Sequence, residues 1–205
     1  DSLLEQSLSS AKERSASVWQ QVIVALARAC DPELDIDDIK SFFVRMLERV
    51  DWKRDLHFQT QTTIDTLDYS GSGLNQGSKV VVAAVGPSVR ELPVEIPTSL
   101  SLPEGYGNPR ICIPGVLAVS ASKSSSGNRR DPILRSFCAA FSGKSPINRF
   151  PLVLLVDDSE FTARSLNNFL WTVFTRSNPA VDIDGIDASI QDKHWGCGGS
   201  LVIDA

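Results

Sequence analysis

The sequence predicts an α/β fold in which duplicated strand–helix–strand units form a mixed or mostly parallel sheet with helices packed on it. The first observation is an internal repeat: a helical stripe, an acidic position, a polar loop and a Gly-Ser pair before an apolar run occur twice. The second is a short apolar run ahead of each stripe, a pattern typical of buried parallel strands. Because a helix that crosses between two strands joins them in parallel, both observations favour an α/β sheet.

The repeat also divides the chain. Residues 1–19 are expected to form an N-terminal helix or linker, and residues 20–205 one α/β domain. The two repeat units occupy about residues 20–86 and 150–205, and residues 87–149 join them. A repeat of this length suggests one supersecondary unit used twice. Since the chain lacks an initiator Met and stops at the end of a predicted strand, we expect it to be part of a longer protein.

The first unit is predicted to begin with a strand at Val22–Leu26, which occupies the place of Val153–Val156 in the second unit. Asp35 is the predicted N-cap of the helix that follows. The apolar face of this helix consists of Ile36, Ile39, Phe43, Met46, Leu47 and Val50. After the polar loop Gln59–Lys79, the unit is predicted to end in a strand over Lys79–Val85.

The second unit is predicted to repeat this order. After the strand at Val153–Val156, Ser165 is expected to cap a helix. The helix carries an apolar stripe with i, i+3, i+4 and i+7 spacing. The stripe consists of Leu166, Phe169, Leu170 and Val173. The unit closes on a predicted strand at Ser200–Ile203.

The connection between the units carries weaker signals. Val94-Glu95-Ile96 alternates as a short strand would. Ile111–Ser120 is apolar around Pro114-Gly115, which predicts a strand interrupted by a turn. The polar segment Ser120–Arg130 is expected to be an exposed loop. A short helix is predicted over Pro132–Phe141. Its apolar side would carry Ile133, Phe137 and Ala140.

The composition of the chain argues against several classes of function. The 205 residues carry a net charge of −5 without a dense block of Lys or Arg, so we expect no nucleic-acid partner. No apolar run approaches the ~20 residues that span a bilayer, so we expect no integral membrane segment. None of the four cysteines forms a CxxC pair, and their spacing fits no zinc signature. Reduced thiols of this kind favour a cytoplasmic protein.

Two polar clusters in the first unit could carry chemistry. Asp55, Asp65 and Asp68 lie close in sequence to His57, and carboxylates with an imidazole can bind a divalent metal or transfer protons. The same residue types also cap turns through backbone amides. The Gly- and Ser-rich end of Gln59–Lys79 could cradle a phosphate, but phosphate loops follow a strand and open a helix. A tight turn is the better interpretation of that segment.

Two further clusters lie in the second unit. His194–Gly199 places Cys197 near a histidine, which is the pattern of an activated nucleophile, but its three glycines favour a turn. Leu154–Ser159 resembles the start of a receiver domain, in which paired acids, here Asp157-Asp158, hold Mg²⁺ near a phosphorylated aspartate. The repeat argues against a receiver, because this acidic turn belongs to a unit that has a partner copy.

Ordered motifs in both units resemble the UbiD family of decarboxylases. In the first unit the motifs are Asp51–Asp55 (DWKRD), Leu67-Asp68 and Gly77–Lys79 (GSK). In the second unit an acidic turn and a helix with a Trp precede a Thr-Arg pair and a later Pro and Asp. Those positions are filled by Asp157, Trp171, Thr175, Arg176, Pro179 and Asp182. The resemblance covers about residues 20–205 and is to the C-terminal region of long bacterial members of the family.

This resemblance implies that the full-length protein is a non-oxidative, reversible (de)carboxylase, a carboxy-lyase, of aromatic or α,β-unsaturated acids, as in ubiquinone or menaquinone biosynthesis. It implies prenylated FMN, a divalent ion (Mn or Mg) and K⁺ as cofactors, with a Glu-Arg-Glu set upstream of the region seen here. We find no equivalent of that set in this chain. We therefore assign no catalytic, cofactor-binding or metal residues, and expect none of these cofactors to bind the chain alone.

In the family, the C-terminal domain closes over the substrate side of the cofactor and takes part in oligomer contacts. The resemblance thus implies a homo-oligomer of two or more copies and a small aromatic acid as the substrate of the full-length protein. The candidates to face the cleft belong to the polar loops of the two units. They are Asp65, Asp68, Asn75, Lys79, His194 and Trp195. Two alternatives remain open: a non-catalytic assembly or binding module, and a receiver-like phosphoacceptor domain.

Overall fold

The structure, a computed structural model, describes residues 35, 37–62, 77–121 and 131–205. In the first unit and the connection, its elements are α3 (Ile39–Arg49), β1 (Leu56–Thr62), β2 (Gly77–Val82), β3 (Tyr106–Ile113), β4 (Val116–Ala121), α4 (Asp131–Ala139) and the 3₁₀-helix η1 (Pro146–Arg149). In the second unit they are β5 (Leu152–Val156), α5 (Ser159–Ala163), α6 (Leu166–Arg176), α7 (Pro179–Asp182), β6 (Ile183–Gly185), β7 (Ala188–Gln191), β8 (His194–Cys197) and β9 (Leu201–Asp204). The predicted N-terminal helix, the strand Val22–Leu26 and residues 122–130 of the predicted loop lie outside the described residues.

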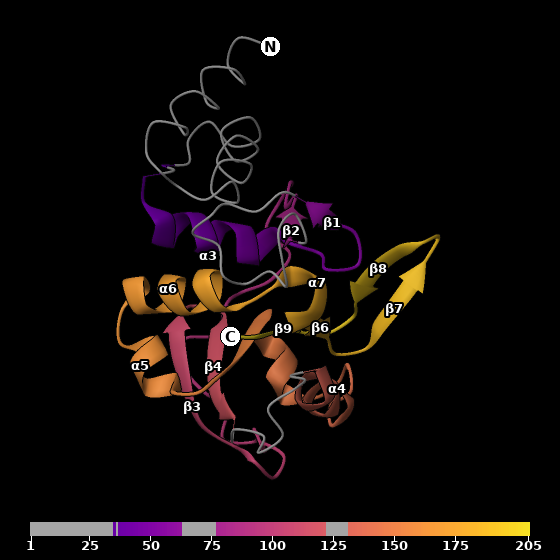
Figure 1. The fold of residues 1–205 in the computed structure, drawn as a ribbon. Helices are drawn as coiled ribbons and strands as arrows, with labels where there is room; N and C mark the ends of the chain where they lie inside the picture. Colours follow the sequence, from indigo (N-terminus) through magenta and orange to yellow (C-terminus); the bar gives the residue numbers. More distant parts are fainter. Residues whose placement is uncertain (1–34, 36, 63–76, 122–130) are drawn as a thin grey trace.

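A five-stranded sheet in the order β3–β4–β5–β9–β6 forms the centre of the fold (Figure 1). The three middle strands run parallel, and the edge strands β3 and β6 run antiparallel to their neighbours. The predicted α/β class with a mixed sheet is confirmed. Two hairpins, β1–β2 and β7–β8, form separate two-stranded sheets. In Figure 1 the second hairpin projects away from the central sheet.

Strand β5 shows why the sheet is covered on both faces. All five of its residues are buried, as its uninterrupted apolar sequence predicts. Leu152, Leu154 and Val156 enter one hydrophobic cluster, and Val153 and Leu155 enter the other. Since successive side chains of a strand point to opposite faces, the sheet separates two cores.

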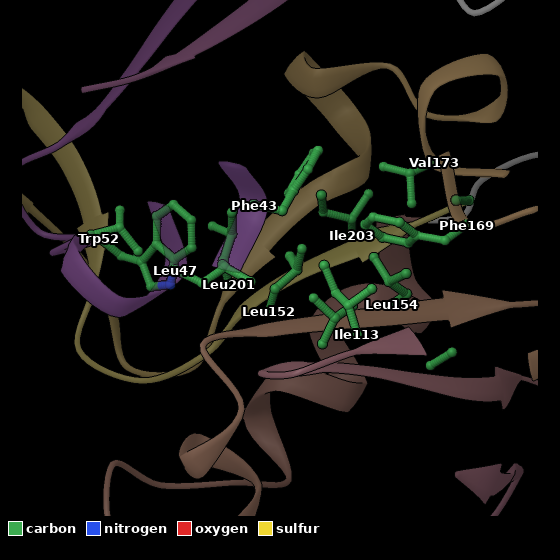
Figure 2. Packing of buried hydrophobic residues seen from close by; sticks show 14 of the residues in the cluster. Phe43, Leu47, Trp52, Ile113, Leu152, Leu154, Phe169, Val173, Leu201 and Ile203 are labelled. Atoms are coloured by element: carbon green, nitrogen blue, oxygen red, sulfur yellow. The ribbon is translucent and has the colours of Figure 1, made fainter. Parts of the chain in front are cut away.

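The first core lies between the sheet and a layer made of α3, α6 and the β1–β2 hairpin. Phe43 of α3 meets Phe169 of α6 edge to face, with ring centroids 5.6 Å apart. Figure 2 shows Trp52 at one end of this cluster and Val173 near the other, with Leu152 and Leu154 of the sheet between them. The second core holds Phe137 of α4 and residues of η1 against the opposite face.

A side chain caps the N-terminus of each of the two long helices, α3 and α6. The carboxylate of Asp38 accepts the backbone N–H of Ser41 and so caps α3. The prediction that Asp35 caps this helix was wrong, because Asp35 instead accepts the N–H of Asp37 in the turn before it. The predicted cap of α6 is confirmed, since the Ser165 hydroxyl accepts the N–H of Asn168 at 3.1 Å.

Three strand predictions need correction. The strand predicted at Lys79–Val85 is β2, which starts at Gly77 and pairs antiparallel with β1 instead of entering the central sheet. Strand β1 includes Gln59–Thr62, a stretch that the sequence pattern places in the polar loop. Val94–Ile96 forms no strand. The predicted interruption at Pro114-Gly115 is confirmed, because it is the turn between β3 and β4.

The helix predicted over Pro132–Phe141 is confirmed as α4, but its buried face differs. Leu134, Phe137 and Cys138 are buried, whereas Ala140 is exposed. These three side chains have the i, i+3, i+4 spacing of a helix stripe, so they form the buried face in place of the predicted Ile133, Phe137 and Ala140.

A turn of the same hydrogen-bond pattern follows the long helix in each unit. In the first unit, Asp51 donates its N–H to the Asp55 carboxylate at 2.9 Å and accepts the N–H of Lys53 on its own carboxylate at 3.0 Å. In the second unit, Asn178 donates to Asp182 at 2.7 Å and accepts from Ala180 at 3.2 Å. Each turn delivers the chain into an edge or hairpin strand, β1 or β6.

Candidate functional site

Three of the six candidate cleft residues lie in the described part of the chain, and three lie outside it. Lys79 lies on β2, opposite Gln59 of β1. His194 and Trp195 are the first two residues of β8. The remaining candidates, Asp65, Asp68 and Asn75, belong to the segment between β1 and β2 that lies outside the described residues.

The structure brings β8 against β1. Phe58 and Trp195 meet edge to face with ring centroids 5.4 Å apart, and both are partly buried against the first core. The neighbouring pair, His57 and His194, has ring centroids 5.3 Å apart. Since adjacent residues of a strand point to opposite faces, the aromatic pair and the histidine pair lie on opposite sides of the junction between the hairpins.

A glycine allows this close approach. A Cβ atom on Gly196 would lie 2.6 Å from the carbonyl oxygen of Trp52 and 2.7 Å from the Cα of Lys53. Both neighbours are backbone atoms, which cannot move aside as a flexible side chain can. Trp52 is itself fixed, because its indole N–H donates to the carbonyl of Pro151 at 2.8 Å.

The base of the loop between β1 and β2 is tied to the second unit. The Ser78 hydroxyl donates to the side-chain oxygen of Asn178 and accepts the N–H of Ala180 at 2.8 Å. Ser78 is 8% exposed, so this link is shielded from water. The Gly-Ser of the first unit is therefore a structural anchor for β2 against α7.

Of the two interpretations of the carboxylates near His57, chemistry or turn structure, the structure supports turn structure for Asp55. The Asp55 carboxylate is 3% exposed and accepts hydrogen bonds from the Asp51 N–H and from the Arg54 guanidinium at 2.6 Å. Hydrogen bonding to Asp55 raises the pKa of Arg54 in turn. Because buried carboxylates need such partners, Asp55 serves the turn.

Glu and Arg side chains near α3 also have structural partners. Arg90 donates to the carbonyl of Leu47 at 2.6 Å, and the backbone N–H of Val89 donates to the carbonyl of Glu48 at 2.8 Å. Arg49 pairs with Glu48 at 3.0 Å. The contacts to Leu47 and Glu48 satisfy carbonyl groups that the end of a helix leaves without intrahelical partners.

The acidic turn after β5 is likewise structural. Asp158 caps α5 by accepting the N–H of Phe161 at 2.9 Å. Asp157 forms an ion pair with Arg176 at 3.0 Å, which explains two of the motif positions noted in the sequence. In the part of the chain that the structure describes, no three His, Cys, Asp or Glu side chains gather as a metal site.

Cys197 is not an activated nucleophile. It is 2% exposed, and burial raises the pKa of its thiol from 9.0 to about 12. Burial has the same effect on the pKa of Cys112 and Cys138. A reactive cysteine needs a lowered pKa and access to solvent, so the Cys–His interpretation of His194–Gly199 does not hold.

Native thiol reactivity checks this assignment. In a Cys30→Ser variant, which removes the one cysteine outside the described residues, iodoacetamide at pH 8 should alkylate almost none of the protein until urea is added. In the folded protein the pKa of the Cys197 thiol lies above its ordinary value of 9.0, so folding favours the neutral thiol over the thiolate. The stability that comes from burying the neutral thiol is therefore complete below about pH 9 and is lost as the pH rises towards 12. Rapid alkylation of Cys197 in the native protein, read by intact mass, would contradict the burial of this thiol.

Sequence reasoning missed the histidine pair. The chain contains two His residues, and an aromatic residue follows each directly, as His57-Phe58 and His194-Trp195. This pattern of a histidine followed by an aromatic residue, present on two strands, is the sequence signal from which their contact could have been predicted. Their contact depends on tertiary packing between segments far apart in the sequence, which neither local pattern encodes.

Comparison with known proteins identifies the family. Residues 6–84, which include α3, β1 and β2, match the 3-octaprenyl-4-hydroxybenzoate carboxy-lyase C-terminal domain of the UbiD family. The chain carries a UbiD-family C-terminal domain. The matched segment contains most of the first repeat unit, including Trp52, Asp55 and the Gly-Ser anchor of this UbiD-family domain.

Curated relatives extend the similarity beyond that segment. A protein of Chlamydia pneumoniae, named as a subunit of 4-hydroxybenzoate decarboxylase, is 30% identical over 183 residues, which are 85% of this chain and 28% of the relative. An uncharacterized protein of Chlamydia trachomatis is 32% identical over 153 residues, 75% of this chain and 24% of the relative. The chain thus spans about a quarter of the length of these relatives. No solved structure matches it.

None of the helices in the described part of this UbiD-family chain is long and apolar enough to cross a membrane.

Proposed function

We propose that the full-length protein is a cytoplasmic UbiD-like non-oxidative (de)carboxylase of aromatic or α,β-unsaturated acids. This chain would be its C-terminal α/β domain, which contributes cleft closure and oligomer contacts and is inactive alone. The observation that carries the proposal is the match of residues 6–84 to the carboxy-lyase C-terminal domain. The similarity to a relative named as part of a decarboxylase supports it.

The described residues do not fit the cofactors that the family uses. A flavin phosphate and its metal ion need convergent cationic groups or carboxylates. Here Asp55 and Asp158 hold turns, Arg90 caps α3, and no group of three or more metal ligands gathers among the described residues. We therefore assign prenylated FMN, the divalent metal and K⁺ to other parts of the longer protein, and derive no chemical step through them from this chain.

Cleft closure would use the β1–β2 hairpin and the start of β8. Ser78 anchors the hairpin to Ala180 of α7 at the point where β2 leaves the loop, and Phe58 packs against Trp195. A loop that must exclude water from a reacting centre works best on a rigid support. Lys79, at the end of the loop, and His194, at the junction, are the described residues best placed to contribute to such a surface.

The test uses the full-length protein produced together with a prenylated-flavin synthase. We expect it to release CO₂ from 4-hydroxybenzoate or a related aromatic acid, and expect protein made without the synthase to release none. A flavin-loaded protein that turns over no member of a panel of aromatic and α,β-unsaturated acids would contradict the proposal. The 205-residue chain alone serves as the inactive control.

A non-catalytic assembly module is the second candidate function. Exposed apolar side chains on the second unit favour it: Trp171 of α6 is 55% exposed, Val181 of α7 56% and Ile190 of β7 71%. Light scattering coupled to size-exclusion chromatography would detect a homo-oligomer. A strict monomer at high concentration would count against both the assembly module and the oligomer contacts proposed for the decarboxylase.

A further inference from the structure

We propose that His57 and His194 form a two-imidazole binding site for a divalent transition-metal ion such as Zn²⁺, which ties the β1–β2 hairpin to the β7–β8 hairpin. The proposal rests on the geometry of the two rings and does not depend on the decarboxylase function.

The spacing of the rings suits shared coordination. Zn–N bonds of about 2.0–2.1 Å and a tetrahedral angle place the centroids of two ligating imidazoles about 5 Å apart. The centroids of His57 and His194 are 5.3 Å apart, and their planes are inclined by 63°. In this edge-to-face arrangement the two rings do not yet share a coordination point. His57 is exposed, so its ring can turn to present a nitrogen to the same ion as His194 without movement of either strand.

One ligand atom already lacks a partner. The Nε2 atom of His194 is buried, yet accepts and donates no hydrogen bond. A buried polar atom without a partner costs about 1–3 kcal/mol, and a metal ion would satisfy it. Imidazole nitrogen is a preferred ligand of Zn²⁺, Cu²⁺ and Ni²⁺.

The surrounding structure holds the rings in place. Directly beside them, Phe58 and Trp195 pack edge to face and fix the same two strands. Gly196 seats β8 on the backbone of Trp52. The two-residue turn at Asp192 and Lys193, with φ of 50° and 67°, sets the register that presents His194.

Two protein ligands leave the remaining positions of the ion to water. Structural zinc sites are closed by four protein ligands, whereas a site with open positions exchanges its ion and ligands more freely. The ion would therefore act as a reversible clamp. Its occupancy would stabilise the junction between the hairpins by mass action, increasingly so as the metal concentration rises.

The test titrates Zn²⁺ alone into the metal-free 205-residue chain, in a Cys30→Ser background that removes the thiol outside the described residues. Calorimetry should give one ion per chain. Because the chain has two histidines, both imidazole spin systems can be followed by ¹⁵N NMR, and they should shift together. His57→Gln and His194→Gln should each weaken binding by about 10-fold or more, the loss that even outer ligand partners cause.

A matched control is Gln59→Ala, which changes the next residue on the same face of β1 and should bind Zn²⁺ as the parent does. A circular dichroism melt of each variant without metal checks that the fold is kept. The proposal is overturned if only one imidazole shifts, if either Gln variant binds like the parent, or if no heat is detected. The last result would mean that the His194 Nε2–H points at the ring of His57 and needs no metal.

Discussion

Replacing Trp52 by alanine should lower the free energy of unfolding by about 3–5 kcal/mol, the range for deletion of a buried aromatic side chain. Trp52 is 4% exposed and lies in the core between the sheet and the helix layer (Figure 2). Its indole N–H also donates to Pro151, a residue of the second unit. The variant therefore loses packing and one of the two hydrogen bonds that the Pro151 carbonyl accepts, the other coming from the N–H of Leu201. Urea unfolding followed by circular dichroism measures the change.

Two variants separate the contributions. Trp52→Phe keeps most of the packing and loses the hydrogen bond to a carbonyl that still accepts the N–H of Leu201, so it should cost about 0.5–1.5 kcal/mol. Trp171→Ala removes the same side chain from an exposed position on α6 and should change stability by no more than about 1 kcal/mol. If Trp52→Ala were as mild as Trp171→Ala, Trp52 could not join the two units as the structure has it.

Replacing Gly196 by alanine should separate the β7–β8 hairpin from the first unit. The new Cβ would lie 2.6 Å from the Trp52 carbonyl oxygen and 2.7 Å from the Lys53 Cα, so backbone must move. Overpacking of this kind costs typically about 1–3 kcal/mol and more where neither side can yield. The movement should also part His57 from His194 and Phe58 from Trp195.

Tryptophan fluorescence and histidine NMR shifts report on this junction. The matched control is Gly107→Ala on β3, where a Cβ meets no atom within 4 Å. We expect Gly107→Ala to leave both signals unchanged and Gly196→Ala to alter both. Parental stability and parental spectra for Gly196→Ala would show that β8 does not pack on the Trp52 segment.

The central sheet and helices could be predicted because their signals are local. The apolar run of β5 predicts a strand buried on both faces, and Ser165 ahead of an i, i+3, i+4 stripe predicts α6 with its cap. The error at Asp35 arose because the first unit offers several acids within one turn. The local hydrogen bond to Ser41, which also lowers the pKa of Asp38, selects Asp38 as the cap.

The candidate site could be predicted only in part. His194 and Trp195 stand out by their unusual composition, and the structure places both on a junction with β1. The sequence groups His57 with nearby carboxylates for metal binding or proton transfer, and not with His194, because no sequence pattern encodes the approach of β8 to β1. That approach depends on the absence of a side chain at Gly196, whose role becomes evident only beside Trp52.

The internal repeat corresponds to a turn that both units share. Asp55 and Asp182 occupy the same place in two turns because a buried carboxylate accepts the N–H four residues before it. The serines after the two glycines differ in their partners: Ser78 bonds Asn178, whereas Ser200 donates to the carbonyl of Phe150. The units thus share a turn and diverge in how their last strands are anchored.

The most direct test of the family assignment is the absorbance spectrum of two proteins, each produced with a prenylated-flavin synthase and purified in the same way. If this chain is the UbiD C-terminal domain and the cofactor belongs elsewhere in the longer protein, flavin absorbance should accompany the full-length protein and be missing from the 205-residue chain. Flavin bound to the 205-residue chain, or none bound to the full-length protein, would contradict it.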